Sequence, residues 1–201
     1  MTFALGDALG MTFLDENRVF DDQPQSVSNM GDMVRRDRGH PSILYYSFCN
    51  EAGCSGATQP ALDFKMITEQ VDGSRAVTMN YFWRRIQPEP NATGIIDVQG
   101  LSHAGADDLI AFHERYPEKP IGNTECCSCQ NQREEDADIA HNATGNSTVY
   151  YTSNTGGCQA AQTGAADSRA WAFGSYVWTA HDYYVRLIAH HATPARPHLR
   201  P

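Results

Sequence analysis

"PSILYYSFCNE", residues 41–51, is an apolar and aromatic run that ends on an amide and a carboxylate. A short apolar run of this length is typical of a buried strand. Another apolar segment shows the same pattern, because it ends on Asp15 and Glu16. The carboxyl ends of parallel strands meet on one face of a barrel, which is where barrel enzymes place their active sites. The sequence therefore predicts that Asn50 and Glu51 lie on such a face.

Short apolar segments alternate with longer amphipathic ones, as expected of parallel strands joined by helices. Strands are predicted over residues 11–16, 41–51, 75–80, 94–100, 119–125 and 172–178. Helices are predicted over residues 26–39, 59–71 and 105–116. The apolar face of the first helix comprises Val27, Met30, Met33 and Val34, and that of the second comprises Leu62, Met66 and Ile67.

A closed barrel of eight parallel strands needs two more strands and typically about 250 residues. We therefore expect an α/β chain that forms about strands 3 to 8 of a partial (β/α)8 TIM barrel. Residues 131–169 are polar and lack periodicity, which is typical of an insertion or a functional loop. They are predicted to interrupt the barrel before its last strand. The barrel domain is expected over residues 1–183, followed by a divergent, disordered tail over 184–201 that contains no acidic residue.

Composition narrows the classes of partner. Hydrophobic residues make up 41% of the 201 residues and charged residues 19%, which is typical of a soluble globular domain. The net charge of −9 argues against a nucleic acid or an anionic membrane as the main partner. No apolar run approaches the roughly 18 residues of a membrane helix. A neutral substrate fits this charge better.

The six cysteines leave several readings open. The segment "ECCSCQ", residues 125–130, lacks the paired C-x2-C spacing of a structural zinc site, which favours scattered thiols or an incidental disulfide and leaves a metal as the alternative. Sequons begin at Asn91, Asn142 and Asn146 and permit glycosylation in a secretory compartment. The location stays open, and secretion or a lysosomal or vacuolar site fits the sequons.

Glu51 and Glu125 form the best candidate catalytic pair. Two carboxylates that face each other across a pocket are the minimum equipment for hydrolysis of a glycosidic bond. The two residues are far apart in the sequence, so only the fold can bring them together. The alternative is that each is a surface acid at the end of a strand.

Six segments together resemble the catalytic barrel of glycoside hydrolase family 2, and most closely its β-galactosidase-like members. They are "GMTFLDENRVF", "MVRRDRGHPSILYYSFCNE", "DGSRAVTMN", "DVQGLSH", "HERYPEKPIGNTE" and "FGSYVWTAHDY". The resemblance covers residues 10–130 and 172–183. Its most specific piece is "RRDRGHPSILYYSFCNE", residues 35–51, which is similar to the family's acid/base signature of Arg-Asp-Arg-Asn-His-Pro-Ser, a strand and Asn-Glu.

This resemblance implies the retaining hydrolysis of terminal non-reducing β-D-galactosides, with Glu51 as general acid/base and Glu125 as nucleophile. It also implies that Asn50 binds the sugar 2-hydroxyl and that Trp178 forms a wall of the sugar subsite. No cofactor is expected.

Some family members bind magnesium or sodium near the acid/base. In this chain the ligand positions expected after Asp15-Glu16-Asn17 hold Phe20 and Asp22, so no metal is predicted.

The sequence departs from the family at several positions. Gly39 replaces an Asn, Cys49 replaces a Gly, and Ser102 and His103 stand where relatives tend to carry Asn-Tyr. The first two barrel strands and the β-sandwich domains that precede the barrel in this family have no counterpart here. A β-glucuronidase, a β-mannosidase or a catalytically silent carbohydrate-binding fragment therefore remain alternatives. We expect a full-length parent to be the enzyme, and a homo-oligomer is open for it, whereas inactivity of this shorter chain by itself is also open.

Overall fold

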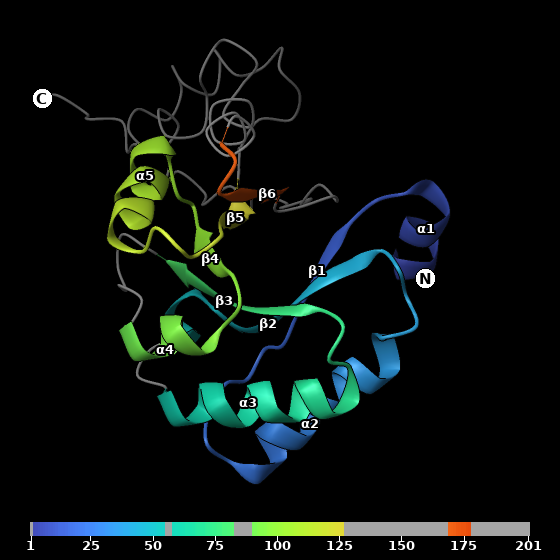
Figure 1. Ribbon diagram of the computed structural model, residues 1–201. Coiled ribbons are helices and arrows are strands. Elements are labelled where there is room, and N and C mark those ends of the chain that lie inside the picture. Colours follow the sequence, from blue (N-terminus) through green and yellow to red (C-terminus); the bar gives the residue numbers. More distant parts are fainter. Residues whose placement is uncertain (1, 55–57, 83–89, 127–168, 178–201) are drawn as a thin grey trace, which may run out of the picture.

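The computed structural model describes residues 2–54, 58–82, 90–126 and 169–177 (Figure 1). The helices are α1 (Thr2–Leu9), α2 (Pro24–Asp37), α3 (Thr58–Val71), α4 (Pro90–Ile95) and α5 (Ala106–Arg115), and a short 3₁₀ helix, η1, covers Glu51–Cys54. The strands are β1 (Phe13–Glu16), β2 (Ile43–Asn50), β3 (Ala76–Phe82), β4 (Gln99–Ser102), β5 (Ile121–Cys126) and β6 (Ala172–Val177).

The six strands form one parallel sheet in sequence order, from β1 to β6. Although β3, β4 and β5 lie between β2 and β6, Tyr45 of β2 contacts two aromatic rings of β6. Its ring centroid lies 4.9 Å from that of Phe173 and 6.1 Å from that of Tyr176. A flat sheet would keep these side chains apart, so the sheet is curled into a half-barrel. This confirms the predicted partial TIM barrel, with strands corresponding to about the third to the eighth.

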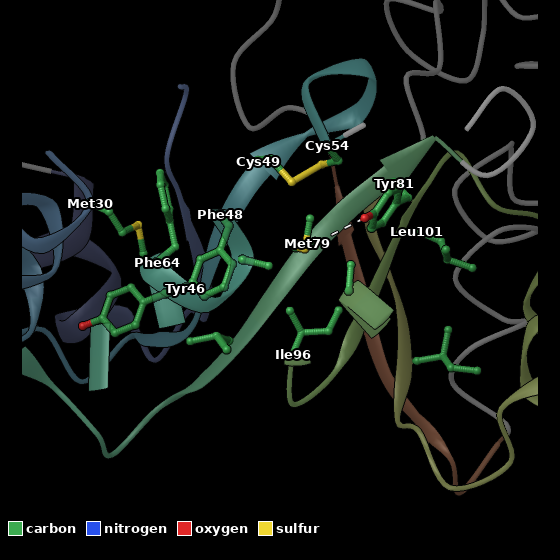
Figure 2. Close-up of a cluster of buried hydrophobic side chains, with 14 of the residues drawn as sticks. Met30, Tyr46, Phe48, Cys49, Cys54, Phe64, Met79, Tyr81, Ile96 and Leu101 are labelled. Carbon is green, nitrogen blue, oxygen red and sulfur yellow. Dashed lines mark hydrogen bonds between the residues drawn. A yellow bond between two sulfur atoms is a disulfide. The ribbon is translucent and has the colours of Figure 1, made fainter. Parts of the chain in front are cut away.

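Helices α2 and α3 pack side by side against the sheet, beneath β1–β3 in Figure 1. Met30 and Val34 of α2 are fully buried, as their spacing predicts. Phe64 of α3 meets Phe48 of β2 edge to face, with ring centroids 5.8 Å apart (Figure 2). Burial of aromatic side chains of this size dominates the energetics of a core. The packing therefore supports β2 from behind and fixes its carboxyl end, where Asn50 stands.

The predicted apolar face of α3 is wrong in part. Leu62 and Met66 are 41% and 57% exposed, whereas Ile67 is partly buried against the core. The buried positions of the helix are Ala61, Phe64 and Thr68. A Cβ atom at Gly31 of α2 would lie 2.7 Å from Cγ1 of Ile67, so the two helices approach closely at this point. This close approach sets the rotation of α3 and turns Leu62 and Met66 outward.

Helix α1 is absent from the sequence prediction, and tertiary contacts explain it. Its Gly6 packs against the ring of Phe13 at the start of β1. Its Asp7 accepts a hydrogen bond from the backbone N of Ser42 at 2.9 Å, and the other carboxylate oxygen lies 2.6 Å from Nδ1 of His40. These partners lie outside the helix, so local periodicity cannot reveal it.

The predicted strand over residues 94–100 is also misplaced. Its first residues complete α4, and β4 begins only at Gln99. Between them Asp97 is tied to β3, because its backbone N donates to the carbonyl of Val77 at 3.1 Å and its carboxylate accepts from the N of Val77 at 2.9 Å. The apolar Ile96 is fully buried between helix and strand, which explains why the segment resembles a longer strand.

Several predicted features fall outside the described residues. They are the tail at 184–201, Trp178 and, apart from Arg169, the insertion at 131–169. Of the helices in the described part of the chain, none has the length and apolar character that crossing a bilayer requires.

Gly100 of β4 lies where no larger residue fits. A Cβ atom there would lie 2.5 Å from Oγ1 of Thr124 and 2.9 Å from the backbone O of Met79. We expect Gly100→Ala to lower the free energy of unfolding by about 1–3 kcal/mol, the usual cost of overpacking. Gly39→Ala is the control, since a Cβ atom there meets nothing within 4 Å. Urea unfolding of both variants checks this, and equal midpoints would contradict it.

Candidate active site

The two predicted catalytic carboxylates lie together at the carboxyl ends of the strands. Glu51 follows β2 directly as the first residue of η1, Glu125 is near the end of β5, and His103 follows β4. One carboxylate oxygen of each glutamate and a ring nitrogen of His103 all lie within 4.8 Å of one another. The curl of the sheet therefore joins residues that are remote in the sequence. Their side chains are partly enclosed, with exposed fractions of 27% for Glu51, 16% for Glu125 and 18% for His103.

Glu51 is held by two residues that follow one another on the chain. The hydroxyl of Ser102 donates to its Oε1 at 2.7 Å, and Nε2 of His103 lies 3.3 Å from the same oxygen. Both Glu51 and His103 have positive φ, at 46° and 53°. This region disfavours residues other than glycine, and such strain is concentrated at functional sites. Glu51 and His103 are thus both strained, and their side chains meet in the site.

Asn80, the polar residue toward the end of β3, connects the parts of the site. Its Nδ2 donates to Oδ1 of Asn50 at 3.0 Å and lies 3.4 Å from Oε2 of Glu125, to which it also donates. The hydroxyl of Thr124 donates to Oδ1 of Asn80 at 2.6 Å. Because Oδ1 is occupied in this way, the amide is oriented with its NH2 group toward the carboxylate. Asn80 therefore links the ends of β2, β3 and β5.

The electrostatics of Glu125 favour its protonated form more than in water. Burial raises its pKa to about 7, and the negative charge of Glu51 adds to the shift. The hydrogen bond from Asn80 and the charge of Arg18 oppose it. Burial has the opposite effect on a base: it lowers the pKa of His103, although the charge of Glu51 opposes this shift. Burial therefore favours the neutral form of the His103 imidazole.

Glu16, at the end of β1, is a third carboxyl group of the site. The hydroxyl of Ser47 donates to its Oε2 at 3.2 Å. Burial raises its pKa to about 7, and the charge of Glu125 adds to this, while hydrogen bonds from Ser47 and Asn80 oppose it. The neighbouring Asp15 points to the opposite face of the strand, as alternation requires. There burial, with the charge of Asp37, raises its pKa to about 7.

Within the described residues, Glu51, His103 and Glu125 also form the group that could hold a metal ion. They are the same groups that would act on a substrate, so a cation there would occupy both carboxylates. Two ligand positions were considered from the sequence. Asp22 accepts a hydrogen bond from Nε2 of Gln23 at 2.9 Å, and the ring of Phe20 packs edge to face on Phe64, with centroids 5.1 Å apart. An apolar ring supplies no donor atom for magnesium.

Sequence reasoning found part of this arrangement. It named Glu51, Glu125 and Asn50, and the structure brings these three together; Trp178 lies outside the described residues. It did not assign Asn80 to the site, although "RAVTMN" shows the same polar end as the other strands. Ser102 and His103 were noted as departures from a family pattern, and their contact with Glu51 depends on the curl of the sheet.

Comparison with known proteins points to one family. The family model described as "Glycosyl hydrolases family 2, TIM barrel domain" matches residues 3–107, just over half of the chain. No curated protein matches the sequence.

Solved structures share the fold. An FMN-binding β-glucuronidase from Facaelibacterium prausnitzii L2-6 matches with a TM-score of 0.60 at 19% identity, over 88% of this chain and 30% of its own. A glycosyl hydrolase family 2 member from Bacteroides cellulosilyticus DSM 14838 has the same score and identity, over 90% and 22%. A β-galacturonidase of that family from Eisenbergiella tayi, bound to galacturonate, gives 0.59 at 16% identity, over 88% and 34%. The chain thus spans about a third or less of each, and at such identity the likeness shows the fold alone.

Proposed function

Because the chain belongs to glycosyl hydrolase family 2, we propose that it hydrolyses terminal non-reducing β-D-galactosides with retention of configuration. The observation that carries the proposal is the approach of Glu51 and Glu125, whose carboxylate oxygens lie within 4.8 Å of each other. Retaining glycosidases hold their two carboxyl groups about 5–5.5 Å apart, whereas inverting enzymes keep them about 6.5–9.5 Å apart to admit a water molecule. The short spacing favours retention.

The reaction then has two steps. A carboxylate oxygen of Glu125 attacks the anomeric carbon while Glu51 gives its proton to the departing glycosidic oxygen, which leaves as an alcohol. Water next attacks the glycosyl ester, and Glu51 takes the proton from that water as Glu125 is released. Asn50 holds the sugar 2-hydroxyl, and Trp178 offers its ring to the apolar side of the sugar.

Charge favours a neutral sugar. The carboxyl groups of Glu16, Glu51 and Glu125 already converge on the site, and a uronate would add another negative charge. A uronide is nevertheless the second candidate, because the charge of Arg18 lowers the pKa of both Glu16 and Glu125 and therefore acts within the site. Two of the structural relatives named above act on uronides. A β-mannoside is the third candidate.

A panel of 4-nitrophenyl β-glycosides tests the proposal with the 201-residue chain. The panel contains the galactoside, glucuronide, galacturonide and mannoside, and Glu125→Gln serves as the inactive control. We expect the galactoside to be cleaved fastest. Faster cleavage of a uronide would change the proposed sugar specificity and leave the proposed mechanism unchanged. Sugar binding without turnover in either form would contradict hydrolysis and support the silent carbohydrate-binding alternative.

The pH dependence follows from the state of Glu125, which must be ionised to attack. Its carboxyl group faces Glu51, Glu16, His103 and Arg18, and burial with the charge of Glu51 raises its pKa to about 7. Above this pH the carboxylate is available, and below it the protonated form accumulates. For a 2,4-dinitrophenyl glycoside, whose leaving group needs no proton from Glu51, we therefore expect kcat/KM to fall about tenfold per pH unit on the acid side of pH 7.

The variant Glu51→Gln provides an internal test of this assignment. Because it removes the charge that disfavours ionisation of Glu125, the acid limb should move to lower pH. A 2,4-dinitrophenyl glycoside is the substrate, since its leaving group needs no proton. Glu69→Gln on the exposed side of α3 is the matched control and should leave the limb in place. An acid limb near pH 4.5 in the unsubstituted chain would contradict the account.

A further inference from the structure

A disulfide closes the turn that carries Glu51. It joins Cys49, in β2, to Cys54, at the end of η1, with the two Cα atoms 5.2 Å apart (Figure 2). This separation lies in the range of about 4.4–6.8 Å that disulfides require. Both cysteines are fully buried. Between them stand Asn50 and Glu51, two of the residues to which the reaction is assigned.

The turn needs support because of its backbone. Glu51 has a φ of 46°, and a side chain with a Cβ atom is disfavoured there. Such a conformation persists only where surrounding structure determines it. The hydrogen bond from Ser102 holds the carboxylate at the far end of the side chain, but the bond between the cysteines acts on the backbone itself.

The disulfide also touches the residue that organises the rest of the site. Sγ of Cys54 lies 3.2 Å from the backbone O of Asn80. A disulfide sulfur carries no proton, so this is a packing contact, and the sulfur could donate a hydrogen bond there only as a reduced thiol. The side chain of Asn80 donates to both Asn50 and Glu125. The sulfur bridge therefore fixes the turn that carries Glu51 against β3, the strand whose Asn80 contacts Glu125.

We propose that the Cys49–Cys54 disulfide is a positioning element of the active site, which holds Glu51 at the glycosidic oxygen. This role rests on the function proposed above. The bond forms by exchange with a low-molecular-weight or protein disulfide: the two cysteines lose two protons and two electrons, and the oxidant leaves as two thiols. Disulfides persist in oxidising compartments.

The first test establishes the bond without reference to activity. Peptide mapping of the unreduced 201-residue chain by mass spectrometry should find Cys49 and Cys54 linked, with the peptide lighter by two hydrogen atoms than after reduction. Two free thiols in the chain, after exposure to oxidised glutathione, would overturn the proposal.

The second test separates positioning from general stabilisation. The double variant Cys49→Ala, Cys54→Ala is compared with Cys158→Ser, which leaves this pair intact. Displacement of Glu51 weakens proton donation, so kcat/KM for a phenyl glycoside should fall on the order of 10- to 100-fold. For a 2,4-dinitrophenyl glycoside, which needs no proton, it should change by less than about threefold. Reduction and reoxidation of the unsubstituted chain should reproduce and reverse the difference, even if the double variant folds poorly.

The outcomes are distinguishable. Equal losses on the two substrates, or none on either, would overturn positioning and leave the proposed hydrolase intact. Absence of turnover in the unsubstituted chain would overturn the hydrolase and the positioning role together, whatever the peptide map shows.

Discussion

Glu125→Gln should reduce kcat/KM by about 10⁴-fold or more, the scale of loss when the reacting group of a catalytic unit is removed. The amide has nearly the same shape, and its oxygen can still accept the hydrogen bond from Asn80, but it does not form a glycosyl ester. The fold should therefore survive while turnover is lost. Steady-state kinetics on the preferred glycoside measures the loss, and Glu118→Gln, an exposed residue just before β5, is the control.

A trapping experiment identifies the nucleophile directly. A 2-deoxy-2-fluoro sugar with a good leaving group forms the glycosyl ester and releases it slowly, because the fluorine destabilises the charged transition state. Mass spectrometry of the digested protein should find the sugar on the peptide that contains Glu125, and on none in Glu125→Gln. Labelling of Glu16 or Glu51 instead would contradict the assignment.

Glu51→Ala should have an effect that depends on the leaving group. Removal of a general acid costs about 10²–10⁴-fold, so we expect a loss of this size in kcat/KM for a phenyl glycoside. The loss should be small for a 2,4-dinitrophenyl glycoside, which leaves unprotonated. Turnover of that substrate should then be limited by the second step, because no base activates water. Kinetics on both substrates gives the comparison.

Chemical rescue provides the counterpart of that experiment. Azide needs no general base and fits the space vacated by the side chain, so it should restore turnover and yield the β-glycosyl azide. Glu114→Gln, on the exposed side of α5, is the matched control. Its kcat/KM should equal that of the unsubstituted chain on both substrates, and azide should not change its turnover. Equal losses on both substrates without rescue would show that Glu51 supports the structure and does not donate a proton.

The strands could be predicted from the sequence where both faces of a strand are buried, because such a strand is a continuous apolar run. Residues 41–51 show this, because β2 is covered by α3 outside and by aromatic rings inside. The rotation of a helix was less accessible. Hydrophobicity selected Leu62 and Met66, whereas the helix packs with Ile67 close to Gly31 of α2, and this rotation buries Thr68 and leaves those two exposed.

The site was predictable as far as the strand ends mark it. Glu51 follows an apolar segment and Glu125 ends the predicted strand at residues 119–125, and parallel strands bring such ends to one face. Their partners were not predictable in the same way, since the contacts of Asn80 depend on the register of three strands. The separation of Asp15 from Glu16 follows from alternation along β1, but which of them faces the site depends on the curl of the sheet. The pairing of Cys49 with Cys54 required the turn at Glu51, which no local pattern shows.

The most direct test of the central claim is the anomeric configuration of the sugar when it is first released. Proton NMR during hydrolysis of an aryl β-glycoside resolves the two anomers before they interconvert. Double displacement through Glu125 predicts that the β-anomer appears first and the α-anomer only later, by mutarotation. Initial release of the α-anomer would mean that water attacks directly, and would contradict the roles assigned to Glu51 and Glu125.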